Sequence, residues 1–214
     1  MNNNNELKVI KPFGPTIARA KMSTELVDNL NNYVEKILSD EKKIKELDHG
    51  NNLAGNVKQE FRLEREFIEK SGYKNFLNEC IIKWLNESGY KEIKEFKIVS
   101  SWIVRQFKNE YNPVHWHGGH ISGVGYLKVP KTFGKISQQE SNKANKNGNL
   151  ELIYGSRQFL SDSSISITPE VGYFYFFPHY MMHTVYPFNE TEEERRSISF
   201  NGIIDNKIFD VYGN

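Results

Sequence analysis

Three of the six histidines of this 214-residue chain lie within six positions, in the stretch NPVHWHGGH. His115 and His117 form a His-x-His pair, and alternate side chains at the end of a strand point to the same face, so both rings can bind one metal ion. A third ligand is available in FPHYMMHTVYPF, where His183 lies in apolar surroundings that would exclude water. Three protein ligands would leave open positions on the ion, as catalytic metal sites require.

A polar strand face follows in the stretch RRSISFN. Strand alternation places four polar side chains on one face of this segment and Arg196 on the other. A guanidinium two residues from a hydroxyl can clamp a carboxylate through parallel hydrogen bonds, and a buried clamp needs an anionic ligand to neutralise it. We therefore expect an anion-binding site on this strand. The four residues of its polar face are Arg195, Ser197, Ser199 and Asn201.

The remaining histidines and a nearby acidic segment are predicted to have no role in the chemistry. His120 and His179 are expected to be hydrogen-bonded core residues, and His49 lies in a long polar loop over residues 48–61 and is given no role. Glu192–Glu194, in NETEEERR, are expected to form a solvated turn.

Two amphipathic helices are predicted in the first half of the chain. The stretch MSTELVDNLNNYVEKIL has one apolar stripe and a capping Ser23, and YKNFLNECIIKWLNE repeats the same spacing and ends before Gly89. Both helices are typical covers for a sheet. We therefore expect an N-terminal helical cover over residues 1–90.

After Tyr90 the chain changes to short β-branched and aromatic segments separated by Gly, Pro and Asn. These segments predict an antiparallel, mainly β fold with a double-stranded β-helix core, which is a cupin-like jelly roll, over residues 91–206. At this length we expect one domain over residues 1–214. The predicted strands are FKIVSSWIVRQF, ISGVGYLKV, NLELIY, ISIT, GYFYFF, MHTVYPF and RSISFNGII.

One insertion interrupts the predicted strands. Residues 131–148, KTFGKISQQESNKANKNG, are too polar to bury anything and are expected to form a mobile flap or a disordered insertion.

Composition limits the partners and the location. With 28 Lys and Arg against 27 Asp and Glu, there is no strong signal for nucleic acid, and a small molecule or a protein side chain is the expected substrate. The single cysteine, Cys80, excludes an intramolecular disulfide and suits a reducing compartment. The N-terminus has no signal-peptide pattern, and no stretch approaches the roughly 20 apolar residues of a membrane span. These features predict a cytoplasmic protein, and they leave the oligomeric state open, a homodimer included.

The order of the segments HWH, SGVGYL, FPHYMMH and RRSISFN resembles the iron(II)/2-oxoglutarate-dependent dioxygenases. The nearest resemblance is to a group of such oxygenases, common in phage and marine bacterial genomes, whose motif is HxH…H…R. It covers roughly residues 100–204, and a phage-encoded member would act in the host-cell cytoplasm. In the wider superfamily the metal motif is His-x-Asp/Glu followed by a distal His, so His117 stands where a carboxylate is usual.

The resemblance implies Fe(II) and 2-oxoglutarate as cofactors, with His115, His117 and His183 as the metal ligands. It also implies that Arg195, with Ser197 and Asn201 on the same strand face, binds the distal carboxylate of 2-oxoglutarate, and that Tyr126 in GYL hydrogen-bonds to it. The implied reaction hydroxylates an unidentified substrate and releases succinate and CO2. Two alternatives are a cupin-like zinc hydrolase or lyase with a three-histidine site, and a ligand-binding jelly roll without enzymatic activity.

Overall fold

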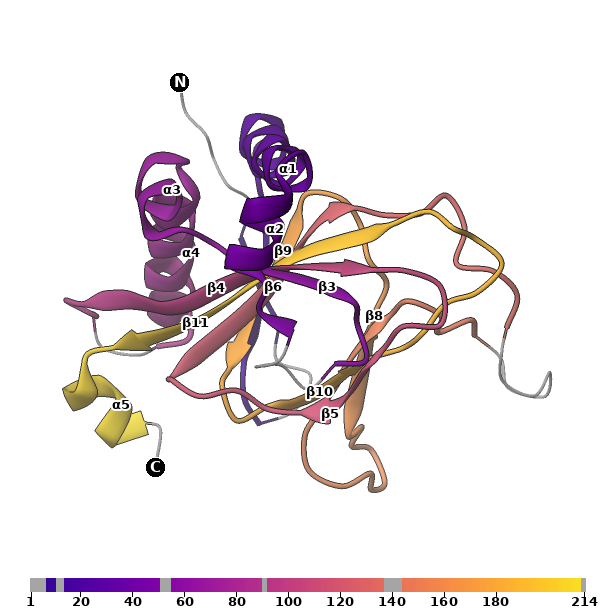
Figure 1. Cartoon of the computed structure of the whole chain (residues 1–214). Helices are drawn as coiled ribbons and strands as arrows, with labels where there is room; N and C mark the ends of the chain where they lie inside the picture. The colour runs from indigo at the N-terminus through magenta and orange to yellow at the C-terminus, as the bar shows by residue number, and fades with distance from the viewer. Residues whose placement is uncertain (1–6, 11–13, 51–54, 90–91, 137–143, 213–214) are drawn as a thin grey trace.

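The structure is a computed structural model that describes residues 7–10, 14–50, 55–89, 92–136 and 144–212 (Figure 1). The strands are β1 (Lys8–Ile10), β2 (Ile17–Lys21), β3 (Gln59–Arg62), β4 (Phe96–Gln106), β5 (Asn112–His115), β6 (Ile121–Lys128), β7 (Leu150–Ile153), β8 (Ser164–Ile167), β9 (Tyr173–Pro178), β10 (Met182–Val185) and β11 (Arg195–Ile204). The helices are α1 (Thr24–Leu38), α2 (Glu41–Leu47), α3 (Arg65–Lys70), α4 (Tyr73–Glu87) and α5 (Asn206–Tyr212).

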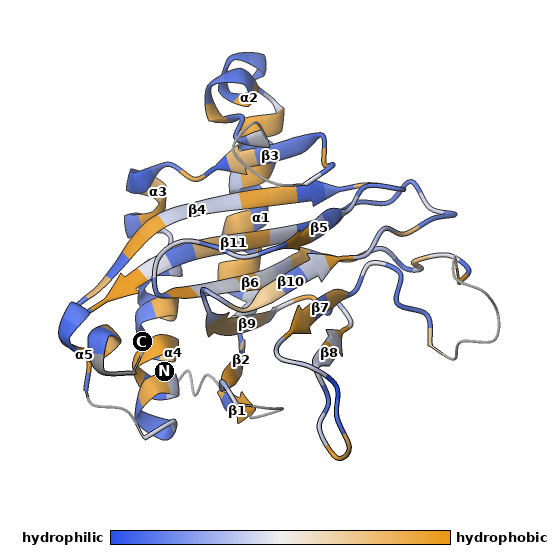
Figure 2. Ribbon diagram, turned by 90° about the horizontal axis from the view of Figure 1, so that it is seen from below, coloured by the Kyte–Doolittle hydropathy of each residue, from blue (hydrophilic) through white to orange (hydrophobic). Residues whose placement is uncertain are grey.

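The strands form two antiparallel sheets that lie face to face beneath the helices (Figures 1 and 2). The larger sheet has the order β1-β2-β9-β6-β11-β4-β3, and the smaller sheet has the order β5-β10-β7-β8. One apolar core fills the space between the large sheet and α1 and α4, and a second core lies between the two sheets. This arrangement confirms the predicted mainly β fold with a double-stranded β-helix core.

Both predicted helices are confirmed, and their apolar stripes cover the large sheet. The Ser23 hydroxyl accepts a hydrogen bond from the Leu26 amide and so caps the first turn of α1. Helix α4 buries Phe76 against Phe174 of β9, with the rings edge to face at 5.6 Å. Trp84 on the same helix donates a hydrogen bond to the Thr16 hydroxyl, which ties α4 to the chain just before β2.

The predicted strands after residue 90 are also confirmed, and the N-terminal part, which was expected to form a helical cover, contributes three strands besides its helices. Strands β1, β2 and β3 come from this N-terminal part and extend the large sheet at both edges. The polar loop expected over residues 48–61 ends in β3, where Phe61 is buried. Such short strands carry too little periodicity to be recognised in sequence. In the fold, β3 pairs with β4, β2 pairs with β9, and β1 pairs with β2.

The expectation that residues 131–148 bury nothing is wrong for the two ends of this segment. The Asn147 side chain is buried and donates hydrogen bonds to the carbonyl groups of Phe133 and Lys135, at 3.0 and 2.8 Å. The Phe133 ring also meets Phe188 edge to face at 5.6 Å. The middle of the predicted flap, residues 137–143, lies outside the described residues.

The expected solvated turn at Glu192–Glu194 is wrong for Glu194, whose side chain is buried. Arg105 and Arg196 each donate to its carboxylate, with both Nε–Oε1 distances at 2.7 Å. Burial alone would raise the pKa of this carboxyl, but the two guanidinium groups hold it at about 2. Arg196 also donates to Glu35 of α1 at 2.8 Å, so this ion-pair network joins the large sheet to the helical layer.

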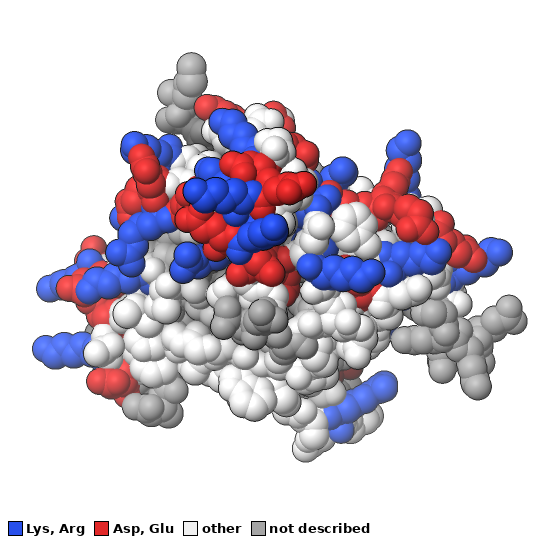
Figure 3. All heavy atoms as spheres, viewed as in Figure 1, with Lys and Arg blue, Asp and Glu red and all other residues white. Residues whose placement is uncertain are grey.

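The charged residues are distributed unevenly over the surface. In Figure 3 Lys, Arg, Asp and Glu alternate over the helical half of the molecule, whereas the lower half, where β5 and β10 lie in Figure 1, is mostly uncharged. No described helix combines the length and the apolar character needed to cross a bilayer.

The glycines of SGVGYL make room for the aromatic core. A Cβ atom on Gly123 would lie 2.6 Å from the Tyr175 carbonyl oxygen and 2.8 Å from the Phe200 ring. A Cβ atom on Gly125 would overlap the Phe174 ring. Strand β6 can therefore lie close to these rings only where it has no side chain on that face.

We predict that Gly125→Ala lowers the free energy of unfolding by about 1–3 kcal/mol, because the added methyl group must displace Phe174 in a packed core. Urea denaturation measures the change. Gly118→Ala is the matched control, since a Cβ atom there meets nothing within 4 Å. Equal stability of the Gly125 variant and the wild type would contradict this account of β6 packing.

Candidate metal centre and co-substrate pocket

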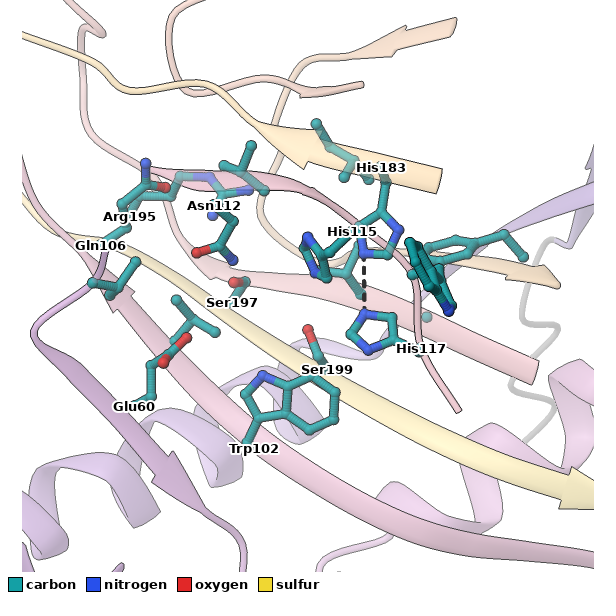
Figure 4. Close-up of a pocket in the computed structure, with 18 residues that line it drawn as sticks. Glu60, Trp102, Gln106, Asn112, His115, His117, His183, Arg195, Ser197 and Ser199 are labelled. Atoms are coloured by element: carbon teal, nitrogen blue, oxygen red, sulfur yellow. Dashed lines mark hydrogen bonds between the residues drawn. The ribbon is translucent and has the colours of Figure 1, made fainter. Parts of the chain in front are cut away.

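Strand pairing brings two of the predicted ligands together. His183 on β10 lies directly opposite His115 on β5, and the centres of their rings are 4.2 Å apart. His117 lies two residues past the end of β5, and its Nε2 atom is 3.0 Å from Nε2 of His183 (Figure 4). One potential ligand atom from each of the three rings lies within 4.8 Å of the others.

Backbone carbonyl groups fix the orientation of two of the rings. Nδ1 of His115 lies 2.7 Å from the Pro113 carbonyl oxygen, and Nδ1 of His183 lies 3.0 Å from that of Met181. A ring that donates from Nδ1 keeps its Nε2 lone pair for an ion, as in many protein metal sites. The arrangement therefore presents Nε2 atoms to one point.

The protein environment keeps the three rings neutral. Burial, together with the neighbouring rings, lowers the pKa of His183 to about 3 and that of His117 to about 4. Burial also lowers the pKa of His115. Because an imidazole must be neutral to bind a metal, the cluster is ready to act as a ligand set at neutral pH.

The other three histidines lie outside this cluster. His179 interacts with the backbone of His117, whose amide donates to the His179 carbonyl oxygen at 3.1 Å. Nδ1 of His120 accepts a hydrogen bond from the Ile204 amide, and its ring stacks on Phe209 at 3.8 Å. These two residues are hydrogen-bonded, as predicted, but they are half-buried rather than core residues. His49 lies beside Trp102, with ring centres 6.3 Å apart.

Arg195 is buried in the same pocket as the three histidines, and only 1% of its surface is exposed. Its Nε and Nη2 atoms have no hydrogen-bond partner among the described residues. Its guanidinium lies over the Tyr126 ring at 5.0 Å, and the Tyr126 hydroxyl is also buried without a partner. Burying the donors of Arg195 and Tyr126 without hydrogen-bond partners costs free energy. An anion bound between the two side chains would accept hydrogen bonds from both.

Ser197 and Asn201, which were also predicted to bind the co-substrate, differ in their position relative to the pocket. Ser197 is buried and lines the pocket, as does Ser199. Asn201 does not line the pocket, because its side-chain oxygen accepts a hydrogen bond from the Ser122 hydroxyl at 2.9 Å. The expectation that Asn201 contacts the co-substrate is therefore not supported by the structure, and its observed contact joins β11 to β6.

Other pocket residues were not identified from the sequence. The cavity, of about 190 Å³, lies between the two sheets, and in Figure 4 the histidines are at one end and Arg195 at the other. Glu60 of β3, Gln106 of β4 and Asn112 of β5 also line it. No motif surrounds these residues, and only the pairing of β3 with β4 brings Glu60 to the pocket.

Comparison with known proteins finds one matching family model. The family model described as "Putative 2OG-Fe(II) oxygenase", where 2OG is 2-oxoglutarate, matches residues 100–201. This span runs from β4 to β11 and contains the three clustered histidines and Arg195. The match covers 102 of the 214 residues, and over this span the chain is similar to the 2OG-Fe(II) oxygenases. Together with the three-histidine cluster, this match shows a 2-oxoglutarate-dependent oxygenase whose cofactors are Fe(II) and 2-oxoglutarate, and it confirms the resemblance found in the sequence.

Solved structures share the fold of this oxygenase. A prolyl-4-hydroxylase from Pseudomonas putida is 13% identical, with 93% of this chain and 92% of that chain covered and a TM-score of 0.53. The viral collagen prolyl hydroxylase of Paramecium Bursaria Chlorella virus-1, solved with 2-oxoglutarate, is 16% identical, with 94% and 97% covered and a TM-score of 0.52. HygX of Streptomyces hygroscopicus, solved with nickel and 2-oxoglutarate, is 11% identical, with 94% and 82% covered and a TM-score of 0.52. A search of curated proteins gave no significant match.

We predict that the metal-free oxygenase loses stability as the pH falls from about 7 to about 5. Over this range His183 of the unfolded chain takes up a proton, whereas the folded ring, with a pKa of about 3, stays neutral, so acid favours the unfolded state. The His183 ring alone lowers the free energy of unfolding by about 1–2 kcal/mol over this pH range. Urea denaturation at both pH values should show a smaller loss for His183→Leu, and an identical loss in the two proteins would contradict the assigned pKa.

Proposed function

We propose that this oxygenase is a hydroxylase in which His115, His117 and His183 hold Fe(II) and Arg195 binds the distal carboxylate of 2-oxoglutarate. The reaction converts a substrate C–H group, 2-oxoglutarate and O2 into the hydroxylated product, succinate and CO2. The observation that carries this proposal is the buried guanidinium of Arg195, whose Nε and Nη2 have no hydrogen-bond partner among the described residues, in the same pocket as the three-histidine cluster.

The histidine cluster fits a divalent ion. Two nitrogen ligands at about 2.1 Å from an ion, bound at a right angle, lie about 3.0 Å apart. The Nε2 atoms of His117 and His183 are 3.0 Å apart. With three protein ligands, the ion keeps positions for a chelating co-substrate and for O2.

The Arg195 end of the pocket fits the co-substrate carboxylate. The Nε and Nη2 atoms are adjacent on the guanidinium, and this edge binds a carboxylate through two parallel hydrogen bonds. The Tyr126 hydroxyl, which also lacks a partner, can donate to the same anion, although the Tyr126 side chain does not line the pocket as the structure stands. Ser197 lies on the same face two residues along β11 and supplies a further hydroxyl.

When bound, the iron and 2-oxoglutarate supply the oxidising chemistry, and the protein supplies position, charge and exclusion of water. Arg195 fixes one end of the co-substrate, so that its other end is directed to the histidine cluster. The Pro113 and Met181 carbonyl groups hold two of the ligand rings. Apolar residues of both sheets, including Phe177 and Leu150, line the remaining wall.

The ligand set carries no negative charge, because His117 stands where the wider superfamily has a carboxylate. A three-histidine set also suits zinc, which was the basis of the hydrolase alternative. The family match and the buried Arg195 favour the oxygenase instead. We propose that the substrate is a small molecule or a protein side chain.

We predict that the anaerobically purified protein binds one equivalent of Fe(II), and that His183→Ala loses this binding because one of three ligands is removed. Calorimetric titration with Fe(II) or Mn(II) measures the stoichiometry. His179→Ala is the matched control, since this nearby ring lies outside the cluster. Stoichiometric binding by the His183 variant would show that the ion is held elsewhere.

We predict that Arg195→Met weakens 2-oxoglutarate binding by roughly 2–4 kcal/mol, because the buried carboxylate loses its charged partner. Titration of 2-oxoglutarate into the anaerobic Fe(II) protein, followed by the charge-transfer absorption of the chelate, measures the loss.

Arg196→Met is the control for this experiment. Arg196 lies on the opposite face of β11, where it binds Glu194 and Glu35, so its loss should lower stability but leave 2-oxoglutarate affinity unchanged. Equal affinity of the wild type and the Arg195 variant, or a loss confined to the Arg196 variant, would overturn the assignment.

A further inference from the structure

The carboxylate of Glu60 is the main polar feature of the pocket that neither the metal nor 2-oxoglutarate uses. Glu60 lies on the edge strand β3, and only 1% of its surface is exposed. Neither of its carboxylate oxygens has a hydrogen-bond partner among the described residues. An unpaired buried carboxylate costs several kcal/mol, so its presence in a ligand pocket needs an explanation.

Arg195 does not neutralise this carboxylate. Glu60 pairs with Val104 of β4, whereas Arg195 on β11 pairs with Gln106, so the two charges are two strands and two residues apart. That offset corresponds to roughly 12 Å between their Cα atoms. No ion pair joins them in the described structure, although both line the same cavity.

Two other residues that line the same cavity each carry an unpartnered side-chain oxygen. The Gln106 amide nitrogen donates to the carbonyl groups of Glu110 and Tyr186, at 2.6 and 3.2 Å, which leaves its side-chain oxygen without a partner. The side-chain oxygen of Asn112 is also buried and unpartnered. Figure 4 shows Glu60 and Gln106 on the side of the pocket away from the histidines, and Asn112 between Arg195 and His115. These three residues therefore offer acceptor atoms.

The co-substrate cannot satisfy these acceptors. At neutral pH 2-oxoglutarate carries two carboxylates and a keto oxygen, so it has no N–H donor and would be repelled by Glu60. Burial and the charges of Asp48 and Glu110 raise the pKa of Glu60 to about 7, and a cation bound beside it would reverse that effect. The complementary ligand is a second molecule with positive charge and several N–H groups.

We infer that Glu60 binds a cationic nitrogen group of the substrate, a primary ammonium or a guanidinium, and that the side-chain oxygens of Gln106 and Asn112 accept its other N–H groups. Trp102 lines the pocket beside Glu60 and offers an aromatic face to the same cation. This inference rests on the proposed function. It narrows the substrate to a basic small molecule or a lysine-like or arginine-like side chain.

The test uses protein loaded with Mn(II) and 2-oxoglutarate without oxygen, titrated calorimetrically with n-butylammonium, n-butylguanidinium, 1-pentanol and pentanoate. We expect at least one of the cations to bind at least tenfold more tightly than pentanol. The preferred cation distinguishes an ammonium from a guanidinium substrate. Glu60→Gln should reduce the affinity for this cation at least tenfold and leave pentanol binding unchanged. Glu60→Leu should have the same two effects.

Glu110→Gln is the matched control. Glu110 is a buried carboxylate that accepts a hydrogen bond from the Phe107 amide at 2.9 Å and does not line the pocket, so the cation preference should persist. Circular dichroism checks that each variant is folded. Equal binding of cations and pentanol, preference for pentanoate, absence of cation binding, or unchanged cation binding in Glu60→Gln would each overturn the inference. Failure of the wild type to bind 2-oxoglutarate would instead contradict the proposed function.

Discussion

The alternation of side chains along β11 is the constraint on which the site depends. This strand lies between β4 and β6 and pairs with both over most of its length, so its two faces cannot be exchanged without breaking both ladders. One face presents Arg195, Ser197 and Ser199 to the pocket. The other places Ile198 and Phe200 in the core beneath the helices. The lining of the pocket and the packing of the helices are therefore fixed by the same strand register.

The two adjacent arginines show how that register divides electrostatic roles. Each is only 1% exposed, so each needs a partner for its charge. Arg196 finds its partners within the protein, in Glu194 and Glu35, and joins the sheet to α1. Arg195 has no carboxylate partner among the described residues, and the proposed anionic ligand would complement its charge. One arginine stabilises the fold, and the proposed role of the other is to select the co-substrate.

The pocket then combines three chemically distinct parts between the two sheets. Neutral imidazoles from the small sheet and its adjoining loop suit a divalent ion, the Arg195 guanidinium suits a carboxylate, and the Glu60 carboxylate suits a cation. The Cα atoms of Glu60 and Arg195 lie about 12 Å apart, with β4 between their strands, and no ion pair joins the two side chains among the described residues. Such a separation would let two ligands of opposite charge bind side by side above the metal, which is what a co-substrate and a basic substrate require.

The sequence by itself determined the elements with clear periodicity: helices α1 and α4, the strands from β4 onward apart from β5, the His-x-His pair and the polar face of β11. These features depend on local spacing, which a linear sequence displays directly. Only the tertiary structure decided that His183 lies opposite His115, that Glu194 is buried between two arginines, that Asn201 is engaged by Ser122, and that Glu60 reaches the pocket. Apart from the contact between Glu194 and Arg196, these contacts join residues distant in the chain, which strand pairing brings together. Pairing partners depend on the packing of the whole sheet rather than on any local pattern.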